Sequence, residues 1–181
     1  MHSPLLNKEN IVEYTNQNTN QNTNQNTKGA VADLCSLVQF DIDAVFAYEA
    51  ALANIDVEMV KITLERFKFD HEQHITELST VISNLGGIPP SRSPDFKGYL
   101  IEGFTKIRSL TGTIGALKAM HGNELLINST YEKALAWGLP AEVQTLIRKN
   151  KMDEDRHIGY IHATIEEAVL DKDNSSAQVA S

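Results

Sequence analysis

Residues 70–85 read DHEQHITELSTVISNL, and they decide the fold. Apolar residues recur every three or four positions along this stretch, which is the period of an α-helix with one buried face. His71 and His74 lie on the same stripe, between Phe67 and Leu78. The pattern therefore predicts a long helix that carries two histidines into the packed core near its middle.

Four segments of the chain share this helical period, and no strand pattern competes with it. They cover about residues 30–55, 57–85, 105–137 and 141–170. Turn-forming residues separate them: Asp56 is suited to cap the second helix, and Gly86-Gly87 with Pro89-Pro90 to end it. Gly138 is suited to end the third helix and Pro140 to begin the fourth. The sequence therefore predicts an all-α protein.

The connections predict how the helices are arranged. About two residues join the first pair of helices and about four join the second pair, so each pair is expected to form an antiparallel hairpin. Residues 86–104, between the hairpins, are numerous enough to run the length of a helix of about 43 Å. The predicted fold class is a four-helix bundle made of two antiparallel hairpins joined by a long crossover.

Composition sets the limits of the folded domain. Residues 15–27 read TNQNTNQNTNQNT, a repeat without apolar side chains that cannot offset the entropy of ordering. We expect a disordered Asn/Gln/Thr-rich extension over residues 1–28, one folded bundle over 29–170 and a second disordered tail over 171–181.

Charge and cysteine content argue against several classes of protein. The formal net charge is −8, which disfavours binding to nucleic acid or to an anionic membrane surface. The chain has no apolar run of about 18 residues and no basic leader followed by an apolar stretch. Cys35 is the only cysteine, so we exclude an intramolecular disulfide and interpret it as a small core residue. We expect a cytoplasmic monomer or homodimer.

The two predicted hairpins resemble each other at a constant offset of 83 residues, the distance from Asp41 to Glu124. The segment DIDAVFAYEAAL, which begins at Asp41, aligns with ELLINSTYEKAL, which begins at Glu124, so that an acid and a Tyr-Glu pair coincide. At the same offset, DHEQHI at 70–75 aligns with DEDRHI at 153–158. Two matches at one offset are unlikely to arise by chance, and they indicate that the polar residues on the stripes form one site.

These polar residues are carboxylates and imidazoles at mid-helix positions. Burial of an unpaired carboxylate is costly, and a cation could compensate several of them at once. Carboxylate oxygen with neutral imidazole suits iron, manganese or zinc, and Glu154 with His157, three positions later, can hold one ion together. The predicted ligands of one or two metal ions are Asp41, His71, His74, His121, Glu124, Glu154 and His157.

At these residues the chain resembles the ferritin-like superfamily, and more narrowly a poorly characterised bacterial branch of ferritin-like domain proteins. The resemblance is carried by DIDAVFAYEAAL, DHEQHITELSTVISNLGGIPP, NELLINSTYEKAL and DEDRHIGYIHA, and it spans about residues 31–170. It implies a metal-binding bundle, often di-iron, used in iron oxidation, storage or peroxide defence. For this branch it implies no firm activity.

The resemblance implies metal ligands at five matched positions, which are Asp41, His74, Glu124, Glu154 and His157. His71 departs from the superfamily pattern, because it stands where a bridging carboxylate is expected in the second helix. An imidazole cannot bridge two ions as a carboxylate does. The departure favours a single ion, or an asymmetric pair with His71 and His121 as additional ligands, over a symmetric di-iron centre.

Some of these residues also fit roles other than metal binding. His121 could be a core histidine, and Tyr48 and Tyr131 are more consistent with hydrogen-bond partners of the acids than with redox centres. Asp43 lies off the stripes and is expected in solvent. A hydrolase is disfavoured because no strand-turn-helix nucleophile motif occurs. The alternative for the whole protein is a non-catalytic structural or interaction bundle with a vestigial metal site, and enzymatic turnover cannot be read from these residues.

Overall fold

The computed structural model describes residues 8–95 and 112–179, with side chains for 27–95 and 112–171. The helices are α1 (Lys8–Leu52), α2 (Glu58–Asn84), α4 (Gly112–Ala134) and α5 (Ala141–Val179). The described residues contain no β-strand, so the all-α prediction is confirmed. None of the described helices is long and apolar enough to cross a membrane.

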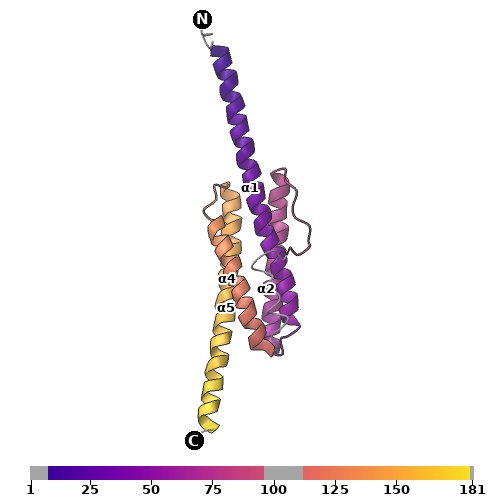
Figure 1. Ribbon diagram of the computed structural model, residues 1–181, viewed down its shortest axis with the longest axis vertical. Helices are drawn as coiled ribbons and strands as arrows, with labels where there is room; N and C mark the ends of the chain where they lie inside the picture. Colours follow the sequence, from indigo (N-terminus) through magenta and orange to yellow (C-terminus); the bar gives the residue numbers. More distant parts are fainter. Residues whose placement is uncertain (1–7, 96–111, 180–181) are drawn as a thin grey trace.

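The helices pack as two antiparallel hairpins. α1 packs mainly on α2, α4 packs mainly on α5, and the two pairs meet through α1 against α4 and α2 against α5. Figure 1 shows that α2 ends at the top of the bundle and that α4 begins at its bottom, so these two helices run in parallel. The chain must therefore cross the length of the bundle between them, as predicted. Most of this crossover, residues 96–111, lies outside the described part of the chain, as does the predicted start of the third helix at 105.

α1 and α5 are longer than predicted. α1 begins at Lys8 and includes the Asn/Gln/Thr repeat, while α5 continues to Val179. Both extensions project beyond the packed bundle, at opposite ends (Figure 1). A helix that is already nucleated adds one hydrogen bond for each further residue that it orders. Composition predicts disorder over 1–28 and 171–181, whereas the structure is helical over 8–28 and 171–179; residues 1–7 and 180–181 lie outside its described part.

The connections show one wrong expectation and one correct one. Asp56 does not cap α2, because Val57 takes the capping position without a side-chain hydrogen bond. The backbone N–H of Asp56 instead donates to Thr113 Oγ1 at 2.9 Å, which ties this turn to the start of α4. At the other end of α2, Gly86 has a φ of 78°, a left-handed conformation that glycine adopts without strain. Its neighbour Gly87 donates to Ile82 O at 2.9 Å, which closes the helix as predicted.

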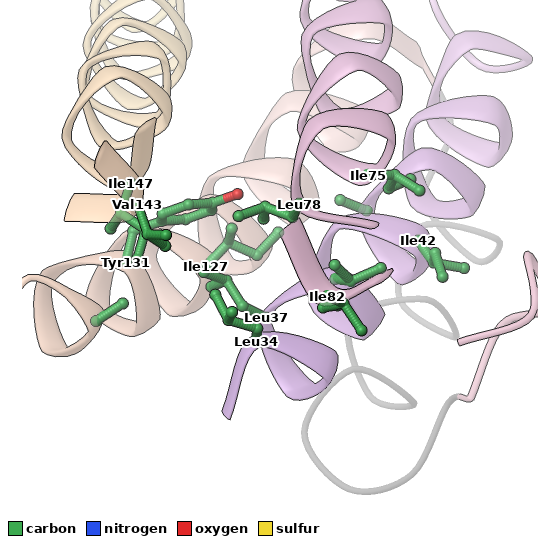
Figure 2. Close-up of a cluster of buried hydrophobic side chains, with 13 residues drawn as sticks. Leu34, Leu37, Ile42, Ile75, Leu78, Ile82, Ile127, Tyr131, Val143 and Ile147 are labelled. Carbon is green, nitrogen blue, oxygen red and sulfur yellow. The ribbon is translucent and has the colours of Figure 1, made fainter. Parts of the chain in front are cut away.

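Two apolar clusters form the core, one toward each end of the bundle. The first includes Leu37, Leu78, Ile127 and Ile147 and is drawn in Figure 2; the second includes Leu64, Leu117, Met120 and Ile161. On α2, α4 and α5, the predicted polar ligands fall between the two clusters along the chain. The fold therefore places a polar layer between two apolar layers, where it is shielded from water.

Asp43 and Cys35 differ from expectation. Asp43 was expected in solvent, but it is buried, and its Oδ1 accepts hydrogen bonds from the Gln39 amide at 3.0 Å and the Asp95 backbone N–H at 2.8 Å. These contacts attach the start of the crossover to α1. Cys35 is only partly buried at the edge of the first apolar cluster, because its thiol faces the segment after α2 and lies 3.6 Å from Ile88 O.

Candidate metal centre

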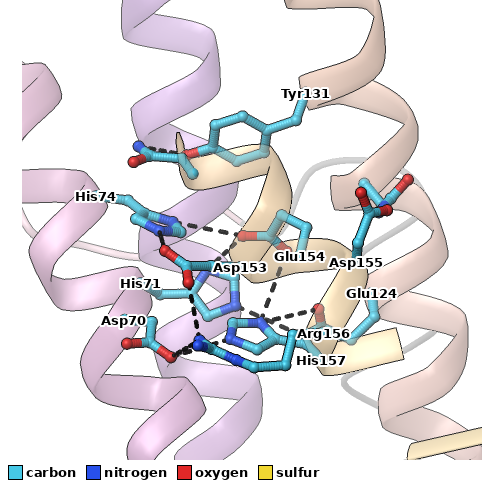
Figure 3. A network of polar contacts seen from close by, with 12 residues as sticks. Asp70, His71, His74, Glu124, Tyr131, Asp153, Glu154, Asp155, Arg156 and His157 are labelled. Atoms are coloured by element: carbon cyan, nitrogen blue, oxygen red, sulfur yellow. Dashed lines mark hydrogen bonds and ion pairs between the residues drawn. The ribbon is translucent and has the colours of Figure 1, made fainter. Parts of the chain in front are cut away.

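Six of the seven predicted ligands meet at the centre of the bundle. They come from all four helices, and each is at most 1% exposed: Asp41 from α1, His71 and His74 from α2, Glu124 from α4, and Glu154 and His157 from α5. Figure 3 shows these α2, α4 and α5 side chains pointing toward one another. The apolar stripes turn inward as the sequence predicts, so polar residues on those stripes are brought together.

The structure places the seventh predicted ligand, His121, apart from this cluster. Its ring packs against His162 on α5, with 5.6 Å between ring centroids, and it is partly exposed. The inward positions of α4 at this level are occupied by Met120 and Glu124, which are both fully buried. His121 belongs to neither of the candidate metal groups that the described residues form.

The six buried residues form two overlapping groups, in each of which the ligand atoms lie within 4.8 Å of one another. The first group, here called the Asp41 group, contains Asp41, His71, His74 and Glu154. The second, here called the Glu124 group, contains His71, Glu124, Glu154 and His157. His71 and Glu154 are shared, so they lie between the two candidate metal positions.

Glu154 directs one oxygen toward each group. Its Oε1 lies 3.4 Å from His74 Nδ1, and its Oε2 lies 3.9 Å from His157 Nδ1. His71 also reaches both sides: Nδ1 lies 2.9 Å from Asp41 Oδ1, and Nε2 lies 3.5 Å from Glu124 Oε1. These two residues stand at equivalent positions of the 83-residue repeat, so the histidine of one hairpin faces the glutamate of the other.

Several donor and acceptor atoms of the cluster have no hydrogen-bond partner among the described residues. The six such atoms that belong to candidate ligands are His71 Nε2, His74 Nδ1, Glu124 Oε2, Glu154 Oε1, Glu154 Oε2 and His157 Nδ1. Native proteins rarely leave buried polar atoms unsatisfied, and each case calls for a water, an ion or a functional explanation. Here the unsatisfied atoms belong to side chains of the same two groups, as metal ligands would.

Two further carboxylates orient the histidines. His74 Nε2 lies 3.3 Å from Asp153 Oδ2, and His157 Nε2 lies 3.1 Å from Asp70 Oδ2. An ionised carboxylate only accepts hydrogen bonds, so each Nε2 carries the hydrogen and each Nδ1 is left to face the cluster. Metal-binding histidines usually donate their second ring nitrogen to a carboxylate in this way. Both aspartates also pair with Arg156, at 2.7 Å from Asp70 and 2.9 Å from Asp153.

Asp70 and Asp153 were not predicted as part of the site. They lie off the apolar stripes, and each reaches a histidine of the opposite hairpin, which the periodicity of a single helix cannot reveal. The signal that could have found them is the repeat itself, since it aligns Asp70 with Asp153 one position before His71 and Glu154.

Two tyrosines hold the acids of α1 and α4. Tyr48 donates to Glu124 Oε1 at 2.6 Å, and Tyr131 donates to Asp41 Oδ2 at 2.7 Å. Both rings are fully buried. The prediction that these tyrosines are hydrogen-bond partners of the acids is confirmed. Asn150, which was not predicted, is also buried and donates to the Tyr131 hydroxyl at 3.4 Å.

Burial and close charges shift the pKa values of the cluster residues. Burial alone lowers the pKa of His74, but the nearby carboxylates of Asp153, Asp41 and Glu154 favour its charged form and raise that pKa to about 10. Burial raises the pKa of Glu154 to about 7, against the attraction of His71 and His74. Without a metal, the histidines therefore hold protons that offset the carboxylates. A metal ion would take the place of those protons.

An open pocket lies next to residues that contact His157. Phe67 stacks on the His157 ring, with 4.2 Å between the ring centroids. The Arg156 guanidinium lies over the Phe67 ring, 5.8 Å from its centroid. The open pocket is lined by Phe67, Phe69, Asp70 and Arg156, among others. Asp70 therefore touches both the pocket and the buried His157.

Comparison with known families adds one assignment. Residues 29–136 match the family described as "Domain of unknown function (DUF2383)". The chain belongs to this family. The DUF2383 match covers Asp41, His71, His74 and Glu124, but it ends before α5, which supplies Glu154 and His157. No curated protein matches the chain.

Proposed function

We propose that this DUF2383 protein is a ferritin-like metalloprotein that binds one or two ions of iron, or of manganese or zinc, between its four helices. We further propose that it serves in iron handling or in the response to oxidative stress. The single observation that carries the proposal is the convergence of buried ligand atoms that lack hydrogen-bond partners.

The donor set supports a transition metal. Nitrogen from three imidazoles and oxygen from three carboxylates lie within reach of one another in the two groups. A buried polar atom without a partner costs about 1–3 kcal/mol, so several of them in one place destabilise the empty site. One cation would bond to several of these atoms at once. Mixed imidazole and carboxylate ligands are typical of iron, manganese and zinc sites.

The surrounding residues are arranged to support such an ion. Asp70 and Asp153 fix the ring orientation of His157 and His74, so that Nδ1 of each faces the cluster. The two apolar clusters exclude water from above and below the polar layer. A bound iron ion would supply redox chemistry toward dioxygen or peroxide.

Metal content tests the proposal directly. The protein, purified without a chelating tag, would be incubated anaerobically with Fe(II), and separately with Mn(II) and Zn(II), then desalted and analysed. We expect at least one ion per chain for one of these metals. Glu154→Gln, which alters a ligand shared by both groups, should lose that ion, whereas Glu132→Gln on the exposed surface should keep it. No retained metal in the wild type would refute the proposal.

The alternative, a structural bundle without metal, is favoured by one observation. His71 and Asp41 form a buried ion pair at 2.9 Å, so part of the cluster is satisfied without any ion. Thermal unfolding separates the two functions, because a ligand that binds only the native state stabilises it by about 2.7 kcal/mol at a free concentration 100-fold above Kd. A melting temperature that does not respond to any of the three metals would support the structural function.

A further inference from the structure

We infer that the two halves of the cluster are not equivalent: one metal ion binds in the Glu124 group, and Asp41 positions His71 instead of binding that ion. The centre is then a one-ion site with two imidazole and two carboxylate ligands. This inference rests on the proposed function and adds the number of ions and the role of each half.

The 83-residue repeat makes equivalence the simple expectation. It aligns Asp41 with Glu124 and His74 with His157. The surroundings are matched as well, because each acid accepts a tyrosine hydroxyl and each of these histidines is held by an aspartate. Two central positions differ between the hairpins. Asp41 and Glu124 are both carboxylates, whereas His71 is an imidazole and its counterpart Glu154 is a carboxylate, so we trace the inequivalence to position 71.

In the Glu124 group, every residue has an unpartnered ligand atom. These are His71 Nε2, Glu124 Oε2, Glu154 Oε2 and His157 Nδ1. Glu124 accepts the Tyr48 hydroxyl through Oε1 alone, so the tyrosine positions the carboxylate and leaves Oε2 available. The group thus offers two nitrogen and two oxygen atoms that have no hydrogen-bond partner in the described part of the chain.

In the Asp41 group, the acid is already engaged. Asp41 Oδ1 accepts from His71 Nδ1 at 2.9 Å, and Oδ2 accepts from Tyr131 at 2.7 Å, so neither oxygen is unpartnered. His71 Nε2 and Glu154 Oε2 lie toward Glu124 and His157, so on the Asp41 side the atoms without a hydrogen-bond partner among the described residues are His74 Nδ1 and Glu154 Oε1. Two atoms alone are too few for a firmly held ion, since protein sites for such metals typically use three or more side-chain ligands.

His71 connects the engagement of Asp41 with the binding of an ion in the Glu124 group. Its hydrogen bond to Asp41 puts the hydrogen on Nδ1 and directs Nε2 toward Glu124, 3.5 Å from Oε1. Asp41 thereby acts on His71 as Asp70 acts on His157, which is the usual relationship between a carboxylate and a metal-binding histidine. A glutamate at position 71 would remove this hydrogen bond, free Asp41 and restore the equivalence with Glu154.

The repeat supplies matched variants for the test. Zn(II), which has no redox chemistry, would be added to the full chain, and bound metal would be measured after desalting and by competition with a chelator. We expect one ion per chain in the wild type. His157→Asn and Glu124→Gln should retain no ion after desalting, whereas their repeat counterparts His74→Asn and Asp41→Asn should retain one. Asp41→Asn should bind up to about 100-fold more weakly, as expected for a residue that orients a ligand. His71→Glu should bind two ions.

Each result separates the inference from the proposed function. No ion in the wild type, with Mn(II) and Fe(II) also negative, refutes both. Two ions in the wild type, equal losses in His74→Asn and His157→Asn, or a single ion in His71→Glu overturns the inference alone. Circular dichroism would first show that each variant is helical. If a variant does not fold, anomalous scattering from a zinc-soaked wild-type crystal replaces it: a peak between Glu124 and His157 supports the inference, and one between Asp41 and His74 overturns it.

Discussion

Tyr48 on α1 donates a hydrogen bond to Glu124 on α4 at 2.6 Å, and Tyr131 on α4 donates one back to Asp41 on α1 at 2.7 Å. The two bonds are related by the 83-residue repeat, and they cross between the hairpins in opposite directions. They therefore connect the two hairpins and, at the same time, fix the position of both central acids.

Removal of either hydroxyl is expected to destabilise the bundle. Tyr48→Phe or Tyr131→Phe would leave a buried carboxylate without one of its donors, at a cost of about 1–3 kcal/mol in the free energy of unfolding. Urea denaturation of the metal-free protein measures this cost. Tyr160→Phe is the control, because Tyr160 lines the open pocket and its loss should change stability by less than about 0.5 kcal/mol. Equal effects of all three variants would contradict the prediction.

The fold was predictable because its determinants are local. The apolar stripe of α2 and the Gly86-Gly87 stop can be read from neighbouring residues, and the short links restrict each pair of helices to a hairpin. The predicted cap at Asp56 is wrong because an acid before a helix is only one way to satisfy the first N–H groups of that helix. Thr113, which is distant in sequence, satisfies the N–H of Asp56 instead.

The residues of the candidate site that lie on the apolar stripes of the helices could be predicted from the sequence. Six candidate ligands lie on these stripes, and they are buried together because a polar residue on an apolar stripe must turn inward with it. The predicted stripe also includes His121, between Leu117 and Glu124. Successive residues are about 100° apart on a helix, however, so Met120, four positions before Glu124, faces inward more directly. Asp43 was placed in solvent because its partner, the Asp95 N–H, lies on the crossover. Contacts between distant segments decide such cases, and one helix's periodicity does not contain them.

The two orienting aspartates are predicted to differ in importance. Asp70→Asn should weaken zinc binding about 10- to 100-fold, because Asp70 holds His157 and such outer carboxylates typically contribute that much. Asp153→Asn should leave zinc affinity nearly unchanged, because Asp153 holds His74, which lies outside the Glu124 group. Chelator competition on both variants measures the affinities. An equal loss in the two would show that both halves of the cluster bind the ion.

Phe67 is predicted to slow the passage of metal into the cluster. Its ring stacks on His157 and lines the open pocket on its other side. Phe67→Leu should increase the rate of zinc loading while the number of bound ions stays the same, at a cost of about 1–3 kcal/mol in stability. Phe69→Leu is the matched control, because Phe69 lines the same pocket but is 55% exposed. Stopped-flow mixing with a zinc indicator gives both rates, and identical rates in the two variants would rule out this role for Phe67.

The metal-free protein is predicted to lose stability in alkali. His74 has a folded-state pKa of about 10, above its ordinary value near 6.5, so its contribution is present below pH 6.5 and is lost as the pH rises through 10. Glu154 acts in the same direction, because its pKa is raised to about 7 and its contribution is lost as the pH rises through that value. Asp41 and Glu124 act oppositely. Burial disfavours the ionisation of both acids. The neighbouring histidines outweigh it and lower both pKa values: His71 and His74 act on Asp41, and His157 and His71 act on Glu124. The contribution of these two acids to stability is therefore lost in acid.

Metal should reverse the alkaline part of this profile. Metal-bound histidine must be neutral and the carboxylates ionised, so affinity rises with pH over the range in which the metal-free protein weakens. Urea midpoints at pH 6, 7 and 8.5 should therefore fall in the presence of EDTA and stay level or rise with saturating Mn(II). His74→Asn should flatten the EDTA profile, while His162→Asn, on the exposed face of α5, should not. A wild-type EDTA profile that is already flat between pH 6 and 8.5 would show that the buried histidines carry no extra protons in the folded state.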